Sequence, residues 1–209
     1  MSDLKIDVVV VGQVRTNCFI ISNEMTREAV IVDPGEDAQL IINKVQSAHL
    51  MVKAVMLTHG HFDHFMAAKQ VVAEYGVPVY SSEQEKDLLE KMELNCSEMF
   101  GVPSQLIPDI VVKDGQKLEL LGTEIEVIST PGHTKGSVCY FFSKEKLLIS
   151  GDTLFFESVG RTDLPTGNSM QIVASIRERL FVLPDEVTVY PGHGCTTTIG
   201  YEKMNNPYV

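Results

Sequence analysis

Short apolar runs bounded by turn-forming residues recur along the whole chain. Because strand side chains alternate between two faces, such runs predict strands at least half buried in sheets. In the first half the runs predict strands at residues 6–11, 17–22, 29–33 and 52–57. In the second half they predict strands at residues 117–121, 124–128, 138–142, 146–149 and 187–190.

Apolar residues at helical spacing interrupt these strands. The spacing predicts helices over residues 38–46, 64–75, 82–94 and 170–180. Strand meanders with helices between them predict an α/β arrangement in which helices cover sheets. No low-complexity linker, charge block or internal repeat divides the sequence, so a single domain over residues 1–209 is expected.

Composition and charge narrow the classes of function. Hydrophobic residues make up 44% of the chain and charged residues 22%, which is ordinary for a globular protein. A net charge of -11 argues against a nucleic-acid or membrane-surface partner. The beginning of the sequence has no signal-peptide pattern, and the four cysteines form no CxxC pair, so we expect reduced thiols and a cytoplasmic protein.

The densest group of chemical side chains follows the predicted strand at 52–57. Thr58-His-Gly-His-Phe-Asp-His64 places His59, His61, Asp63 and His64 within one strand-to-helix loop. Imidazole nitrogen and carboxylate oxygen are the ligands of divalent transition metals. Gly60 is expected to let the chain bend so that its two neighbouring histidines face a common centre.

Three later segments repeat this placement after predicted strands. They are Thr130-Pro-Gly-His133, Ser150-Gly-Asp152 and Tyr190-Pro-Gly-His193. Each is weak alone, since Pro-Gly turns are common. Together with the first loop they place five of the six histidines beside strand ends, whereas His49 has no such neighbours and is interpreted as structural.

These residues resemble the signature of the metallo-β-lactamase-fold superfamily, a T-H-x-H-x-D-H loop followed by single His, Asp and His ligands. The resemblance implies a four-layer αββα sandwich with two divalent metal ions at one edge. Zinc is the preferred metal, and iron and manganese are the alternatives. It implies ligand sets for the two ions, with Asp152 bridging them: His59, His61 and His133 for the first; Asp63, His64 and His193 for the second.

Within the superfamily, Gly151-Asp-Thr-Leu-Phe and the segment 158–165 are similar to glyoxalase II-type hydrolases. The implied activity is hydrolysis of a thioester such as S-lactoylglutathione by a hydroxide that bridges the metals, with Asp63 as a catalytic residue that orients it. The expected partner is a small thioester or ester, and the expected state is a monomer or small homo-oligomer. Glyoxalase II enzymes add a C-terminal helical domain that helps to grip glutathione, whereas this sequence ends at Val209.

The sequence gives fewer signals for substrate contacts than for metal ligands. Arg161 and Asp163 are candidates, and a structural ion pair is the preferred interpretation of them. Phe155 is a candidate for a pocket wall, although aromatic residues in such runs commonly belong to a core. Cys195 is expected to be a thiol that does not ligate the metal ions.

Three other functions are weighed against the hydrolase. A persulfide dioxygenase-like mononuclear iron oxidoreductase is the alternative, because those relatives share the histidine loop and a Gly-Arg-Thr-Asp stretch. A metal-binding protein without turnover is disfavoured, because structural zinc sites are commonly rich in cysteine. Asp152 stands where class B β-lactamases carry a cysteine, which argues against antibiotic hydrolysis.

Overall fold

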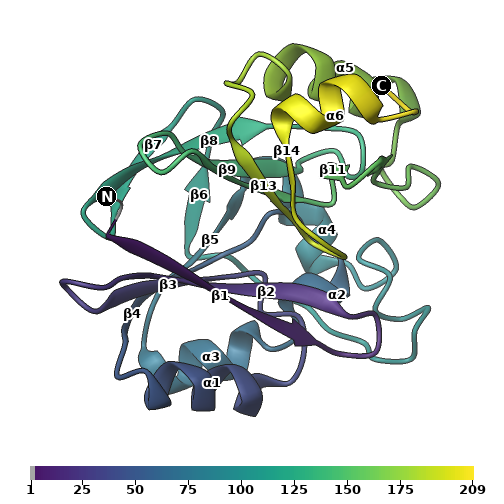
Figure 1. Cartoon of the computed structure of the whole chain (residues 1–209). Coiled ribbons are helices and arrows are strands. Elements are labelled where there is room, and N and C mark those ends of the chain that lie inside the picture. Colours follow the sequence, from purple (N-terminus) through teal and green to yellow (C-terminus); the bar gives the residue numbers. More distant parts are fainter. Residues whose placement is uncertain (1–2) are drawn as a thin grey trace.

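The computed structural model describes residues 3–209 and contains two six-stranded sheets (Figure 1). In the first sheet the strands follow one another in chain order: β1 (Leu4–Val11), β2 (Thr16–Asn23), β3 (Glu28–Val32), β4 (Met51–Met56), β5 (Val79–Ser82) and β6 (Ile110–Val112). The first three strands are antiparallel, and β3 to β6 are parallel.

The second sheet is built from the other half of the chain. Its order is β14 (Thr197–Thr198), β13 (Thr188–Pro191), β10 (Leu147–Gly151), β9 (Val138–Phe142), β8 (Thr123–Ser129) and β7 (Lys117–Leu120). Only the β10–β13 pair is parallel. A small hairpin, β11 (Leu154–Phe155) with β12 (Ser158–Val159), follows β10.

Helices form the two outer layers (Figure 1). α1 (Ala38–Ser47) and α3 (Ala68–Tyr75) cover the first sheet. α5 (Ser169–Ser175), continued by a π-helical turn at Ile176–Leu180, and α6 (Ile199–Asn205) cover the second. The expected four-layer αββα sandwich is therefore confirmed. The chain also forms two short helices, α2 (Phe62–Phe65) and α4 (Lys86–Glu90). A 3-10 turn at Glu83–Glu85 precedes α4.

Three apolar clusters fill the three interfaces between these layers. Ile20 belongs to the cluster under α1 and α3, whereas the next residue, Ile21, belongs to the cluster between the sheets. Tyr140 faces the same central cluster, and Phe141 faces α5. Both faces of each sheet are thus buried, which explains why the strands appear in the sequence as nearly continuous apolar runs.

The predicted strands are all present, but two helices differ from expectation. The helix predicted over 64–75 is interrupted, because the Ala67 amide donates to the carbonyls of Pro34 and Gly35. The helix predicted over 82–94 ends at Glu90, and the chain beyond it turns around the buried side chain of Asn95, which bonds to nearby backbone groups. The sequence did not predict β5, β6, β14, α6 or the β11–β12 hairpin.

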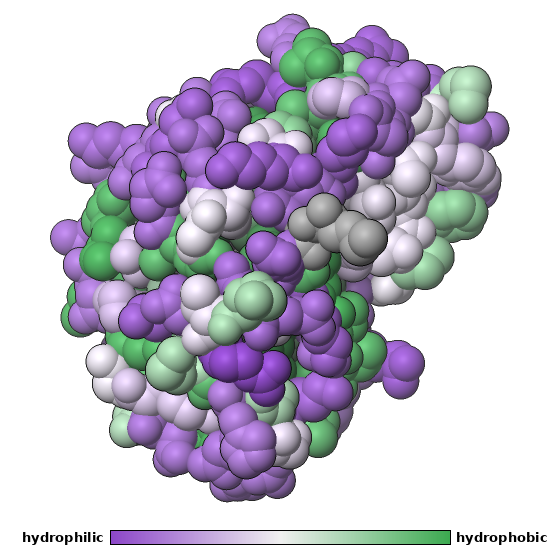
Figure 2. Space-filling view, turned by 60° about the vertical axis from the view of Figure 1, so that its left-hand side comes forward, coloured by the Kyte–Doolittle hydropathy of each residue, from purple (hydrophilic) through white to green (hydrophobic). Residues whose placement is uncertain are grey.

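The surface reflects the acidic, polar composition. In the view of Figure 2 hydrophilic residues predominate, and apolar residues form separate patches among them. Within residues 3–209, the helices all fall short of the length and apolar content that a membrane span requires.

Direct hydrogen bonds join the two sheets near the end of β4. The buried Tyr140 hydroxyl donates to the Leu57 carbonyl at 2.8 Å. The Val138 amide donates to the Thr58 carbonyl at 2.9 Å. The residues that follow β4 are therefore fixed relative to β9 of the opposite sheet.

Tyr140→Phe should lower the free energy of unfolding by about 1–2 kcal/mol, because the buried carbonyl of Leu57 loses its hydroxyl partner. Urea unfolding followed by circular dichroism measures the change. Tyr208→Phe, at a side chain that is 60% exposed, is the control. Equal stability of the two variants would show that the bond between the sheets contributes nothing.

Candidate metal centre

Strand directions bring the chemical loops to one edge of the sandwich. β3 and β4 are parallel, so the residues after both strands meet at the same end of the first sheet. β10 and β13 are parallel, and β8 runs with them because it is antiparallel to β9, which is antiparallel to β10. The segments that carry His133, Asp152 and His193 therefore emerge together, opposite the loop that follows β4.

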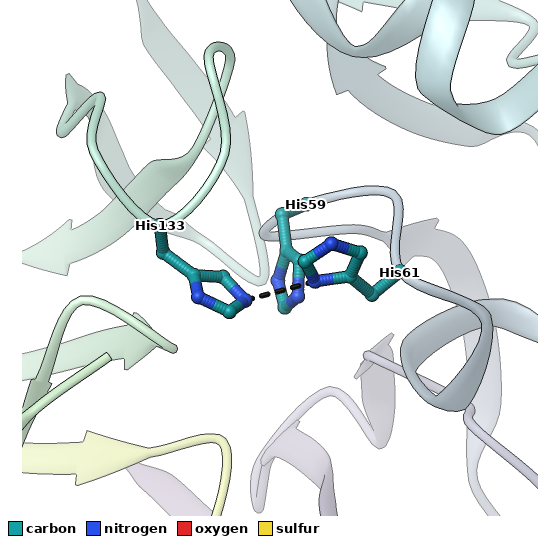
Figure 3. Close-up of side chains that lie close together, drawn as sticks. All are labelled: His59, His61 and His133. Carbon is teal, nitrogen blue, oxygen red and sulfur yellow. Dashed lines mark hydrogen bonds between the residues drawn. The ribbon is translucent and has the colours of Figure 1, made fainter. Parts of the chain in front are cut away.

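Three imidazoles converge at this edge (Figure 3). The rings of His59, His61 and His133 point toward one another, with centroids 4.6 to 4.9 Å apart. One nitrogen of each ring lies within 4.8 Å of the others. His61 Nδ1 lies 2.9 Å from His133 Nε2. The sequence predicted this trio from two separate segments, and the structure brings it together.

A second group lies beside the first and adds carboxylates. Candidate ligand atoms of Asp63, His64 and His193 also lie within 4.8 Å of one another. The carboxylate of Asp152 stands between the groups, with Oδ1 3.4 Å from His64 Nε2 and Oδ2 3.6 Å from His133 Nε2. This is the placement expected of a residue shared by both groups.

Outer hydrogen bonds orient the imidazoles. Nδ1 of His59 is 3.1 Å from the Thr58 hydroxyl, and Nδ1 of His133 is 2.7 Å from the Arg161 carbonyl. These contacts leave the Nε2 atoms of the two rings directed at the centre. Hydrogen bonds to the ring nitrogen on the far side from the metal fix the tautomer and orientation of histidines that ligate metals.

Electrostatics differ between the two groups. Burial holds the pKa of His59, His61 and His133 below the usual range, so these imidazoles stay neutral with free lone pairs. Burial also opposes a charge on His64, but nearby carboxylates outweigh it and raise its pKa to about 10. Burial would raise the pKa of Asp63, but the adjacent His64 and His193 lower it instead. The second group thus favours positive charge at its centre.

Asp33 has a role that the sequence did not predict. It was expected only as the last residue of the strand at 29–33, but its buried carboxylate accepts bonds from the Thr58 amide at 2.8 Å and the Thr58 hydroxyl at 2.6 Å. Its Oδ2 also lies 2.9 Å from His64 Nδ1. An acid directly after a strand, as at Asp152, was the signal available in the sequence.

Glu85 is a second functional residue that the sequence did not identify. Its buried carboxylate accepts bonds from the Gly60 amide at 2.6 Å, the Gly136 amide at 2.7 Å and the Thr134 hydroxyl at 2.7 Å. One side chain therefore joins the loop after β4 to the loop after β8. Burial raises its pKa, against the effect of these three bonds. Nothing in the local sequence distinguishes it from neighbouring surface acids.

Glycines allow these close approaches. A Cβ at Gly60 would lie 3.0 Å from Glu85 Oε2, and the backbone φ of Gly60 is not positive. A Cβ there would crowd Glu85, and the neighbouring His59 and His61 face a common centre as expected; the bend at Gly60 itself stays a prediction. A Cβ at Gly192 would lie 2.2 Å from Asp152 Oδ1 and 2.7 Å from His64 Cε1, so no larger residue fits there.

The remaining candidates occupy the surroundings of the centre. Arg161 and Asp163 form an exposed two-bond ion pair, with both N–O distances at 2.7 Å, at the pocket over the two groups. Phe155 lines this pocket, 6.3 Å from the His193 ring. Cys195 is exposed, and His49 lies in the exposed turn after α1.

The donor set fits divalent metal ions. Buried side-chain atoms that lack a hydrogen-bond partner among the described residues include Nε2 of His59, His61 and His64 and Oδ1 of Asp152. Leaving such atoms unpaired costs free energy. All four belong to candidate ligands, and cations bound there would supply the missing partners.

Comparison with known proteins gives consistent matches over nearly the whole chain. A model of the metallo-beta-lactamase superfamily matches residues 11–193. Hydroxyacylglutathione hydrolase GloC of Haemophilus influenzae is 35% identical over 210 residues, which cover 99% of this chain and 98% of that protein.

Two solved structures match both fold and sequence. The structure titled BLEG-1 B3 metallo-beta-lactamase has a TM-score of 0.93 at 38% identity, over 98% of this chain and 99% of that one. TTHA1623 in a di-iron-bound form has a TM-score of 0.88 at 33% identity, over 97% and 100% of the two chains. The resemblance expected from the histidine loop is therefore confirmed: the chain belongs to the metallo-beta-lactamase superfamily, whose fold binds divalent metal ions.

Proposed function

We propose that this protein is a metal-dependent hydrolase of thioesters, of the hydroxyacylglutathione hydrolase type. The observation that carries the proposal is the pair of adjacent His/Asp groups with a carboxylate shared between them. The 35% identity to GloC over almost the full length of both chains supports the same class of reaction.

Seven residues would hold two divalent ions. Zinc is the preferred metal, and the di-iron form of TTHA1623 supports iron as the alternative. They are His59, His61, Asp63, His64, His133, Asp152 and His193. When bound, such ions lower the pKa of coordinated water toward neutrality and polarise a carbonyl oxygen. In the overall reaction one water is consumed, the carbonyl C–S bond breaks, and a carboxylic acid and a thiol are released.

The protein's own side chains orient the attacking water and hold charge. Asp63 accepts a hydrogen bond from the buried Thr16 hydroxyl at 2.9 Å. Its Oδ2 lies 3.3 Å from His193 Nε2 and faces the pocket. The lowered pKa keeps this carboxylate ionised, so Asp63 can accept a hydrogen bond from the attacking water and orient it, while Thr16 holds the carboxylate in place.

The metal-loaded protein should hydrolyse S-lactoylglutathione with kcat/KM of roughly 10⁴ M⁻¹s⁻¹ or above. Loss of thioester absorbance measures the rate. Protein treated with a chelator and then given back zinc or iron is the control, and activity should disappear and return.

Two parallel assays test the competing activities. Oxygen uptake with glutathione persulfide by a form containing one iron would favour the persulfide dioxygenase alternative. Hydrolysis of a β-lactam is the second assay, because of the similarity to the protein titled as a B3 metallo-beta-lactamase. Turnover in either assay without thioester hydrolysis would overturn the proposal.

Asp63→Asn should lower kcat by about 10²-fold or more, because a neutral amide replaces the charged carboxylate that orients the attacking water. Steady-state kinetics on metal-loaded protein, with metal content measured on the same sample, check this outcome. Asp185→Asn is the matched control, since Asp185 pairs with Lys203 away from the centre and its side chain is 72% exposed. Full turnover by Asp63→Asn at normal metal content would exclude Asp63 from the chemistry.

A further inference from the structure

The pocket over the metal centre has a polar floor and an apolar rim. Its volume is about 560 Å³, within the range of small-molecule sites. The floor consists of candidate metal ligands. The rim comes from separate segments of the chain: Val14 after β1, Met99 and Phe100 after α4, and Phe155 and Val159 in the β11–β12 hairpin.

Several rim side chains expose apolar surface to solvent. Val14 is 42% exposed, Met99 67% and Phe100 57%. Phe100 stacks on Phe62 with ring centroids 4.7 Å apart, so its position is set by a residue between two candidate ligands. Apolar side chains gathered from distant segments around one opening are typical of a ligand site. A thioester whose carbonyl lay over the floor would therefore have this rim around the groups attached to it.

Positive charge is scarce at the same opening. Arg161 is the one lysine or arginine that lines the pocket in the described part of the chain. Its Nε and Nη2 each donate to the Asp163 carboxylate, at 2.7 Å in both cases. A carboxylate on a substrate would have to share the guanidinium with Asp163, which already neutralises its charge, so the added ion pair yields little net free energy.

We propose that this pocket selects thioesters with an apolar acyl group on an uncharged thiol, and that Asp163 is a specificity-determining residue that withholds Arg161 from anionic carriers. The inference rests on the proposed thioester hydrolysis and narrows its substrate class. Glutathione carries two carboxylates and an ammonium group, and the rim offers them no unpaired cation among its lining residues.

Four thioesters test the selectivity. Lactoyl and isobutanoyl groups, which differ by a hydroxyl in place of a methyl, are each placed on glutathione and on uncharged N-acetylcysteamine. Each kcat/KM is divided by the rate constant of the same thioester with hydroxide in solution, which removes the intrinsic effect of the lactoyl hydroxyl. After this correction isobutanoyl-N-acetylcysteamine should exceed lactoylglutathione by about tenfold or more, the range of small apolar differences in a hydrophobic pocket.

Two variants assign the effect to named residues. Phe100→Ala should reduce the isobutanoyl-to-lactoyl ratio by about fivefold or more, because apolar rim area is lost. Met25→Ala, at a side chain that is 78% exposed in the β2–β3 turn, is its control. Asp163→Asn should raise the glutathione-to-N-acetylcysteamine ratio by about fivefold, because it frees the guanidinium; Asp185→Asn is the control for this charge change.

The outcomes separate the two proposals. Absence of hydrolysis with all four thioesters would overturn thioesterase function, and the selectivity with it. Hydrolysis in which lactoylglutathione remains fastest after correction, with unchanged ratios in Phe100→Ala and Asp163→Asn, would overturn the selectivity and leave the hydrolase in place.

Discussion

The structure depends on accommodating a dense group of imidazoles and carboxylates where water hardly reaches. Burial of unpaired polar atoms is costly, so each such side chain needs partners on its outer side. Thr58, Asp33 and the Arg161 carbonyl supply them for three rings, and the inner nitrogens remain directed at one another. His133 Nε2 lies 2.9 Å from His61 Nδ1, whereas Nε2 of His59 and Nε2 of His64 lack a hydrogen-bond partner among the described residues, and a cation would supply one. Metal binding and folding are therefore expected to be thermodynamically linked in this chain, since an ion held by the folded state adds its binding free energy to stability.

Two buried carboxylates convert separate loops into one rigid edge. Asp33 links the end of β3 to Thr58 and His64, all on the first sheet. Glu85 links that sheet's histidine loop to the loop after β8 on the second sheet. Because these bonds are made by the protein itself, the spacing of the candidate ligands does not rely on the metal alone. Such preorganisation is what allows a site to stabilise charge without rearranging during the reaction.

Local signals in the sequence predicted helices covering sheets and the loops that carry candidate ligands, whereas the four-layer order and the two ligand sets came from the resemblance to the superfamily. Continuous apolar runs indicate strands buried on both faces, and histidines beside Pro-Gly turns stand out against a chain with six histidines. Glu85 and the end of the helix at Glu90 could not be predicted in this way. Their explanation lies in partners 25 or more residues away for Glu85, and in the bonds of Asn95 for the chain that follows the helix. Asp33 was predicted only as the end of a strand, and its bond to His64 joins residues 31 positions apart, which the fold brings together.

The floor and the rim of the pocket come from different kinds of structure. The floor is set by strand ends and by Gly192, where even a methyl group would collide with Asp152, so its geometry tolerates little change. The rim is set by turns and a hairpin whose apolar side chains are partly exposed, so substitutions there cost the fold little. Chemistry and selectivity can therefore vary separately on this fold. Relatives of similar sequence identity do bear different names, a hydroxyacylglutathione hydrolase and a B3 metallo-beta-lactamase, as is common where one fold carries several activities. It follows that the reaction class of this protein should be inferred from the floor, and its substrate from the rim.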